Sequence, residues 1–128
     1  MTVMKIDYCE TAEFKKDFKR LAKRFKTLTE DIQTAKRNAI ELYHLLKIDN
    51  QSVVQIKDIK SNEVAFYKLK KFACKSLKGK GVRSGIRIIY AYRESLSRVE
   101  FIEMYYKSDK ENENRERIKA YLRAETKI

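Results

Sequence analysis

Three cations stand inside apolar segments, where a β-strand would hold their side chains in place. Lys68 and Lys70 alternate with apolar residues in FYKLKKF (residues 66–72), and Arg87 interrupts GIRIIYAY (residues 85–92). Alternate residues of a strand face the same side of a sheet. We therefore expect Lys68, Lys70 and Arg87 to bind phosphate and to stabilise negative charge during a reaction. The alternative is that the two lysines only solvate an exposed sheet face.

A basic, glycine-rich connection lies between these two segments. All three glycines of the chain fall within residues 75–85, and the segment lacks the spacing of a Walker motif. Glycines let a backbone approach an extended nucleic acid closely. The candidate nucleic-acid-binding residues here are Lys71, Lys75, Lys78, Lys80 and Arg83. The other interpretation is a mobile basic turn.

Glu103 and Tyr105 are candidate proton-transfer groups in the last apolar segment, where they share one face. If that face also carries Lys68 and Arg87, Glu103 is a candidate general base and Tyr105 a candidate general acid. If it faces the core, both are packing residues. The sequence leaves the register open. We expect the single histidine, His44, to lie on a helix surface.

No metal site and no cofactor are expected. Cys9, Cys74 and His44 do not have the spacing of a zinc site, and two cysteines are too few for a disulfide framework. Both thiols are therefore predicted to be structural.

Positive charge is concentrated in the middle of the chain. The sequence has 30 Lys and Arg residues against 18 Asp and Glu residues, a net charge of +12. Eleven of those basic residues and two of the acidic ones lie in residues 57–93. Such an excess of positive charge destabilises the folded chain by mutual repulsion. It therefore predicts a polyanionic partner, above all nucleic acid. An acidic protein that masks the charge is a compatible alternative.

The hydrophobic pattern predicts one domain over residues 1–128 that begins with a strand and two helices. The strand is expected at residues 3–8. Thr11 is expected to cap the first helix. The second runs from about Thr29 to Leu46, with Leu46 as the last residue of its apolar stripe and His44 beside that stripe.

The second half of the chain has the pattern of a sheet followed by a helix. Residues 53–56 are an edge strand or an irregular connection, and three antiparallel strands are expected at residues 64–73, 86–92 and 98–106. A capping box at residues 108–111 precedes a short C-terminal helix. The fold class is α+β, with helices on one face of an antiparallel sheet. With neither a leader nor a membrane-spanning segment expected, the chain is predicted to be cytoplasmic.

Three segments together resemble the C-terminal half of the RelE-type toxins of the RelE/ParE superfamily: FYKLKKF, SGIRIIYAY and VEFIEMYYKSDKENENRERIKAYL. The resemblance covers residues 64–123. Its most specific part is a glycine, one residue, an arginine and an apolar run that ends in tyrosine. It implies a RelE-like fold and an endoribonuclease that cuts messenger RNA in the ribosomal A site. It also implies a cognate antitoxin that wraps and neutralises the toxin.

The resemblance assigns roles to the strand cations. Arg87 matches the family's transition-state arginine, and Lys68 and Lys70 match its lysine pair. Because the loop after that strand is longer here, a gapless alignment would select Lys78 and Lys80 instead. We prefer Lys68 and Lys70, which a strand would preorganise.

The family's later arginine and its catalytic tyrosine have no clean match in this sequence. Residues 107–110 and Asn114 occupy that region. Lys107 can replace the arginine, and Tyr105 or Tyr106 the tyrosine.

Metal-independent cleavage of RNA requires a base for the 2′-hydroxyl proton, cations that stabilise the phosphorane and an acid for the 5′-oxygen. Neighbouring cations favour the neutral amine, so Lys68 or Lys70 is the expected base. Arg87 and Lys107 are the expected phosphate clamp, and Tyr105 is the expected acid. The expected products carry a 2′,3′-cyclic phosphate, which can open to a 3′-phosphate, and a 5′-hydroxyl.

Two other functions suit the same fold. One is a ParE-like toxin that poisons DNA gyrase, and the other is a non-catalytic module that binds RNA or the ribosome. Cleaved message distinguishes the first hypothesis from both alternatives, and gyrase-linked DNA breaks distinguish the two alternatives from each other.

Overall fold

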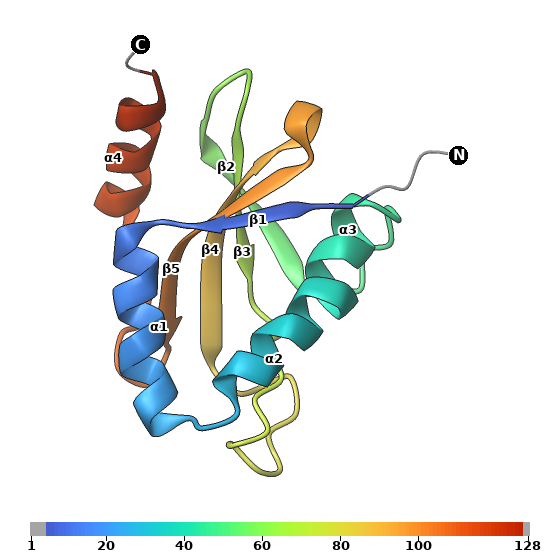
Figure 1. Ribbon diagram of the computed structural model, residues 1–128, viewed down its shortest axis with the longest axis vertical. Coiled ribbons are helices and arrows are strands. Elements are labelled where there is room, and N and C mark those ends of the chain that lie inside the picture. Colours follow the sequence, from blue (N-terminus) through green and yellow to red (C-terminus); the bar gives the residue numbers. More distant parts are fainter. Residues whose placement is uncertain (1–4, 127–128) are drawn as a thin grey trace.

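The computed structural model describes residues 5–126, and a twisted β-sheet lies at its centre (Figure 1). Five strands lie within these residues, in the spatial order β1-β5-β4-β3-β2. Their bounds are Asp7–Glu10 (β1), Val53–Lys60 (β2), Ala65–Leu69 (β3), Ile86–Arg93 (β4) and Arg98–Tyr106 (β5). In the described range, no helix is long and apolar enough to cross a membrane.

The central strands confirm the predicted antiparallel meander. β3 pairs with β4 and β4 with β5, with Arg87 directly opposite Tyr105. β2 is an edge strand antiparallel to β3, which decides the alternative left open for residues 53–56. A short 3₁₀ helix, η2 (Glu94–Leu96), connects β4 to β5.

Two strand predictions were wrong in part. β1 runs parallel to β5, with Asp7 opposite Arg98, so the sheet is only mostly antiparallel. Of the strand predicted at residues 3–8, residues 3 and 4 lie outside the described residues. β3 ends at Leu69 instead of residue 73, because Phe72 pairs only with Arg83 in an isolated bridge.

The N-terminal helices cover one face of the sheet and diverge from their junction instead of lying side by side (Figure 1). Thr11 caps the first helix as predicted, since its Oγ1 accepts a hydrogen bond from the Phe14 amide at 3.1 Å. The helical segments are α1 (Ala12–Arg24), α2 (Leu28–Ala35), the π-helical η1 (Lys36–Glu41) and α3 (Leu42–His44).

The π-helical segment changes which residues face the sheet. A π turn is longer than an α turn, so the buried stripe runs from Ala35 through Ile40 to His44. Leu46, predicted to continue the stripe, is 64% exposed, and His44, predicted on the helix surface, is 4% exposed. Both predictions were wrong for the same reason.

The last helix, α4 (Arg115–Thr126), packs on the opposite face of the sheet, which corrects the expectation of helices on one face. Among the described residues, Ile118 packs in a core cluster with Phe66 and Ile89, separate from the cluster beneath α1 and α2. The predicted capping box was also wrong. Asn114 caps α4, because its Oδ1 accepts a hydrogen bond from the Arg117 amide at 3.1 Å. The α+β fold class is confirmed.

Candidate nucleic-acid interface

An open cleft of about 550 Å³ lies where β4 begins and β5 ends. Its walls come from these two strand ends and from the connection between β3 and β4. Within residues 5–126 its lining includes six cations and no carboxylate: Lys70, Lys71, Lys80, Arg83, Arg87 and Lys107. Such a surface attracts anions and suits the binding of several phosphates.

Arg87 joins the two walls of this cleft. It is the second residue of β4, on the face away from the N-terminal helices, while Ile86 and Ile88 pack beneath those helices. One guanidinium nitrogen of Arg87 donates a hydrogen bond to the backbone carbonyl of Lys70. This contact fixes the direction of the side chain and leaves further N–H donors for a ligand.

The basic connection is tied down at its C-terminal end by Ser84. The Ser84 hydroxyl donates to the carbonyl of Phe72 and accepts from the Ile86 amide at 3.1 Å. Phe72 also forms a β-bridge with Arg83. The position of Arg83 in the cleft wall therefore depends on backbone contacts across the connection.

Near its middle the same connection is held by the start of α2. The Thr27 Oγ1 accepts from the Ser76 amide at 2.9 Å and donates to Asp31 at 2.7 Å. Asp31 is buried and also accepts from the Lys75 amide. A buried carboxylate needs such donors, so α2 is a structural support of the cleft.

Tyr106 is the tyrosine that lines the cleft. Its ring packs edge-on against Phe25, with centroids 5.1 Å apart, and the Arg24 guanidinium lies 5.2 Å from its centroid. Gly85 brings the β4 backbone close to this ring, and the Lys107 amide donates to the Gly85 carbonyl at 2.8 Å. The hydroxyl is therefore carried on a ring with fixed packing.

Tyr105 shares the sheet face of Arg87 but does not line the cleft. It is buried in the cluster under α4. Burial, the carboxylates of Glu113 and Glu103, and a hydrogen bond to Glu113 raise the pKa of Tyr105 to about 12, although Arg87 opposes the shift. The phenol therefore stays protonated at neutral pH.

Lys68 lies in a neighbouring groove and is paired. Its Nζ is 2.6 Å from Glu113 Oε1, and the two side chains are 22% and 11% exposed. Burial raises the pKa of Glu113, but the hydrogen bond from Lys68 and the charge of Arg115 outweigh burial, so the pKa is lowered. An ammonium held by a carboxylate is a poorer candidate base than a free lysine.

Glu103 also faces the side of Lys68 and Arg87, which decides the register that the sequence left open. It is buried, accepts a hydrogen bond from the Asn114 amide at 2.8 Å, and is bonded by the Lys110 ammonium. Its carboxylate holds the segment before α4 and does not line the cationic cleft.

The structure thus gathers part of the predicted site. Lys70 comes from the preferred lysine pair and Lys80 from the alternative pair, and both line the cleft with Arg87 and Lys107. Four predicted residues are not among its lining residues: Lys68, Lys75, Lys78 and Tyr105. Tyr106, the second choice for the tyrosine, is among them.

No family model matches the sequence, and no curated protein matches it. A solved structure is similar. It is the crystal structure of the archaeal RelE–RelB complex from Pyrococcus horikoshii OT3, with a TM-score of 0.49 and 11% sequence identity over 81% of this chain and 97% of that chain. The chemistry of this chain has to be inferred from its own cleft.

Proposed function

We propose that this chain is the toxin of a type II toxin–antitoxin pair, a metal-independent endoribonuclease that cuts messenger RNA on the ribosome. The observation that carries the proposal is the cleft, where six cations and a tyrosine meet without an opposing carboxylate among the described residues. An arrangement of this kind can hold a phosphodiester and stabilise the extra charge of a phosphorane.

The reaction is a transesterification in which the 2′-oxygen is the nucleophile and the 5′-oxygen is the leaving group. A base removes the proton of the 2′-hydroxyl, and the 2′-oxygen attacks the adjacent phosphorus to form the 2′,3′-cyclic phosphate. The bond from phosphorus to the 5′-oxygen breaks, and an acid protonates that oxygen to give a 5′-hydroxyl. The protein supplies position, charge and proton transfer. No atom changes its oxidation state in this reaction.

We assign these roles among the residues that line the cleft. Lys70 is the base, because it is exposed there while Lys68 is paired with Glu113. Arg87 and Lys107 clamp the phosphate, and Tyr106 replaces Tyr105 as the acid. Lys71, Lys80 and Arg83 bind the neighbouring phosphates. Arg87 is expected to contribute about 3 kcal/mol to the transition state, or about a hundredfold in rate.

The cellular partners follow from the same surface. Messenger RNA and the ribosome supply the polyanion, and the proposed antitoxin neutralises the toxin by covering the cationic cleft. A protein that covers this cleft has to present carboxylates, because positive side chains placed opposite the six cations would be repelled. Cytoplasmic location follows from this role.

Brief induction of the chain without an antitoxin tests the proposal. We expect growth and translation to stop, and primer extension on abundant messages to reveal new 5′ ends within coding regions. Growth that continues at confirmed expression of folded protein would contradict the toxin role. Arrest with intact messages and gyrase-linked DNA breaks would instead support gyrase poisoning, and arrest with neither would support a binding module.

A further inference from the structure

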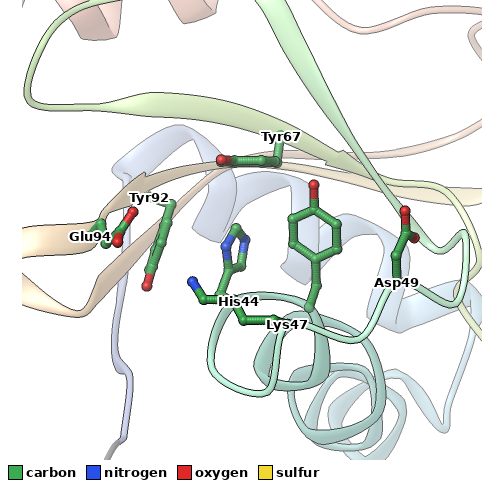
Figure 2. Close-up of a pocket in the computed structure, with 7 residues that line it drawn as sticks. His44, Lys47, Asp49, Tyr67, Tyr92 and Glu94 are labelled. Carbon is green, nitrogen blue, oxygen red and sulfur yellow. The ribbon is translucent and has the colours of Figure 1, made fainter.

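A second pocket, of about 330 Å³, lies at the opposite end of β3 and β4 from the cationic cleft (Figure 2). Aromatic rings dominate it. The Tyr67 and Tyr92 rings lie on two sides of His44, and the carboxylates of Glu94 and Asp49 lie at opposite ends of the pocket. Tyr43 and Lys47 complete the lining. None of these residues has a part in the proposed cleavage.

His44 is fixed by a fully buried tyrosine. Its Nε2 lies 2.7 Å from the Tyr90 hydroxyl. The Tyr90 hydroxyl has no other hydrogen-bond acceptor among the described residues, so it donates to Nε2, which leaves the proton of the neutral ring on Nδ1. Burial and the nearby Lys47 lower the pKa of His44 to about 4, so the ring is neutral at physiological pH.

The rings around His44 are held at close distances. The Tyr92 centroid is 4.0 Å and the Tyr67 centroid 4.7 Å from the His44 centroid. Tyr67 is also stacked on Tyr90 at 5.6 Å. Tyr43 and Tyr67 remain half-buried, so they retain surface that a flat ligand can contact. Base stacking on such preorganised aromatic rings is the common way in which proteins hold single-stranded RNA.

The charge of this pocket is opposite in kind to that of the cleft. Two carboxylates and one ammonium line it. Burial raises the pKa of both Tyr67 and Tyr92, and the charge of the nearby Glu94 adds to the shift of each. Carboxylates repel phosphate and accept hydrogen bonds from amino groups. The pocket therefore suits a neutral base with amino hydrogens, and not a phosphate.

A smaller hollow, of about 130 Å³, adjoins the cleft on the side towards the aromatic pocket. It shares Lys71 and Val82 with the cleft, and it is lined by Asn50, which follows Asp49 of the aromatic pocket. Along β3 and its continuation, Tyr67 and Lys71 are four residues apart, or about 13 Å. A short stretch of single strand can span that distance.

We propose that the aromatic pocket binds one unstacked base of the single-stranded RNA whose backbone lies in the cationic cleft. The base stacks on the tyrosines, and Glu94 accepts a hydrogen bond from its exocyclic amino group, as a carboxylate does from cytosine N4. Cytosine is therefore preferred to uracil, which carries an oxygen at that position. The identity of the strand rests on the proposed function, but the base pocket itself does not.

Nucleosides test the pocket apart from the cleft, because they carry no phosphate. We expect cytidine, titrated into the isotope-labelled full chain, to shift the amide NMR signals around His44, Tyr67 and Glu94, with little dependence on salt. The affinity for uridine should be lower than that for cytidine by about threefold or more. Glu94→Gln, an exposed change that leaves the core intact, should remove most of this preference. Inorganic phosphate should shift the cleft residues instead.

Tyr67→Leu provides the second arm, with Tyr121→Leu on α4 as the matched loss of a tyrosine. Tyr67→Leu should weaken cytidine binding about tenfold or more, and Tyr121→Leu should leave it unchanged. The proposal is wrong if folded wild-type protein shows no nucleoside-dependent shifts at this pocket, or if tetramethylammonium shifts these signals and nucleosides do not. Cytidine binding without RNA cleavage would contradict only the proposed function, and cleavage without cytidine binding only the base pocket.

Discussion

At the scale of single residues, two adjacent tyrosines differ in their environment: Tyr105 is buried, and Tyr106 lines the cleft. If Tyr106 is the acid, Tyr106→Phe keeps the ring that packs against Phe25 and removes the proton donor. Cleavage should fall about a hundredfold or more, with little change in the free energy of unfolding. Tyr105→Phe is the control and should cleave nearly as well as the wild type. Single-turnover cleavage rates measure both, and a reversed order would return the role to Tyr105.

The ion pair of Lys68 with Glu113 predicts a pH dependence of stability. The pKa of Glu113 is lowered from its usual 4.5 in the folded chain. The contribution of the pair is therefore fully present above about pH 4.5 and is lost as the pH falls through the lower, folded value. Glu113→Gln should thus be less stable than the wild type at pH 7, and the difference should shrink towards pH 3. Urea unfolding at both values tests this, and a difference that grows in acid would contradict it.

Residue identity alone predicted Arg87 well and His44 badly. Arg87 stands between Ile86 and Ile88, and strand alternation was enough to place it on the face opposite the helices. The position of His44 depends on the π-helical turn and on Tyr90, which lies in another element. The spacing of apolar residues within the helix reveals neither the π-helical turn nor the contact with Tyr90.

At the scale of elements, Gly85 controls how closely the start of β4 approaches the end of β5. It has a φ of +87°, and a Cβ there would lie 3.3 Å from the Tyr106 ring. Gly85→Ala should lower the free energy of unfolding by about 1–3 kcal/mol and disturb the cleft. Gly81 also has a positive φ, of +56°, but open space around it, so Gly81→Ala should cost only about 1 kcal/mol. Thermal unfolding compares the two, and equal losses would mean that contact with Tyr106 does not matter.

Strands and caps were predictable from sequence where local signals decide them, as at Thr11 and at β4. The errors lie where a distant segment decides. β1 joins the sheet beside β5, at the far end of the sequence, and α4 starts directly after Asn114, whose backbone amide is held by Glu103. Lys70 and Lys80 come from different predicted pairs but line the same cleft, because Ser84 and Asp31 hold the connection between β3 and β4 in a folded-back path. Residue spacing does not reveal that path.

At the scale of the whole molecule, the net charge is +12, and six of the cations line one cleft. This concentration predicts that RNA binds at the cleft and not evenly over the surface. If each neutralises one phosphate, the logarithm of RNA affinity should fall with the logarithm of salt with a slope of about −4. Lys80→Ala should reduce the slope by about 0.7. Lys78→Ala removes an exposed lysine outside the cleft lining and should change it less. Filter binding at several salt concentrations measures these slopes, and equal effects of the two variants would argue for a diffuse basic surface.

The central claim is that the cleft cleaves RNA, with Arg87 at its centre. The most direct measurement is the chemistry of the new RNA ends that purified protein produces on a message in programmed ribosomes. We predict 5′-hydroxyl and 2′,3′-cyclic phosphate ends at defined positions, formed about a hundredfold more slowly by Arg87→Ala. That variant should change the free energy of unfolding by no more than about 1 kcal/mol, since one partly exposed hydrogen bond is lost. Ends that carry a 5′-phosphate, or equal cleavage by a folded Arg87→Ala protein, would contradict the proposed site.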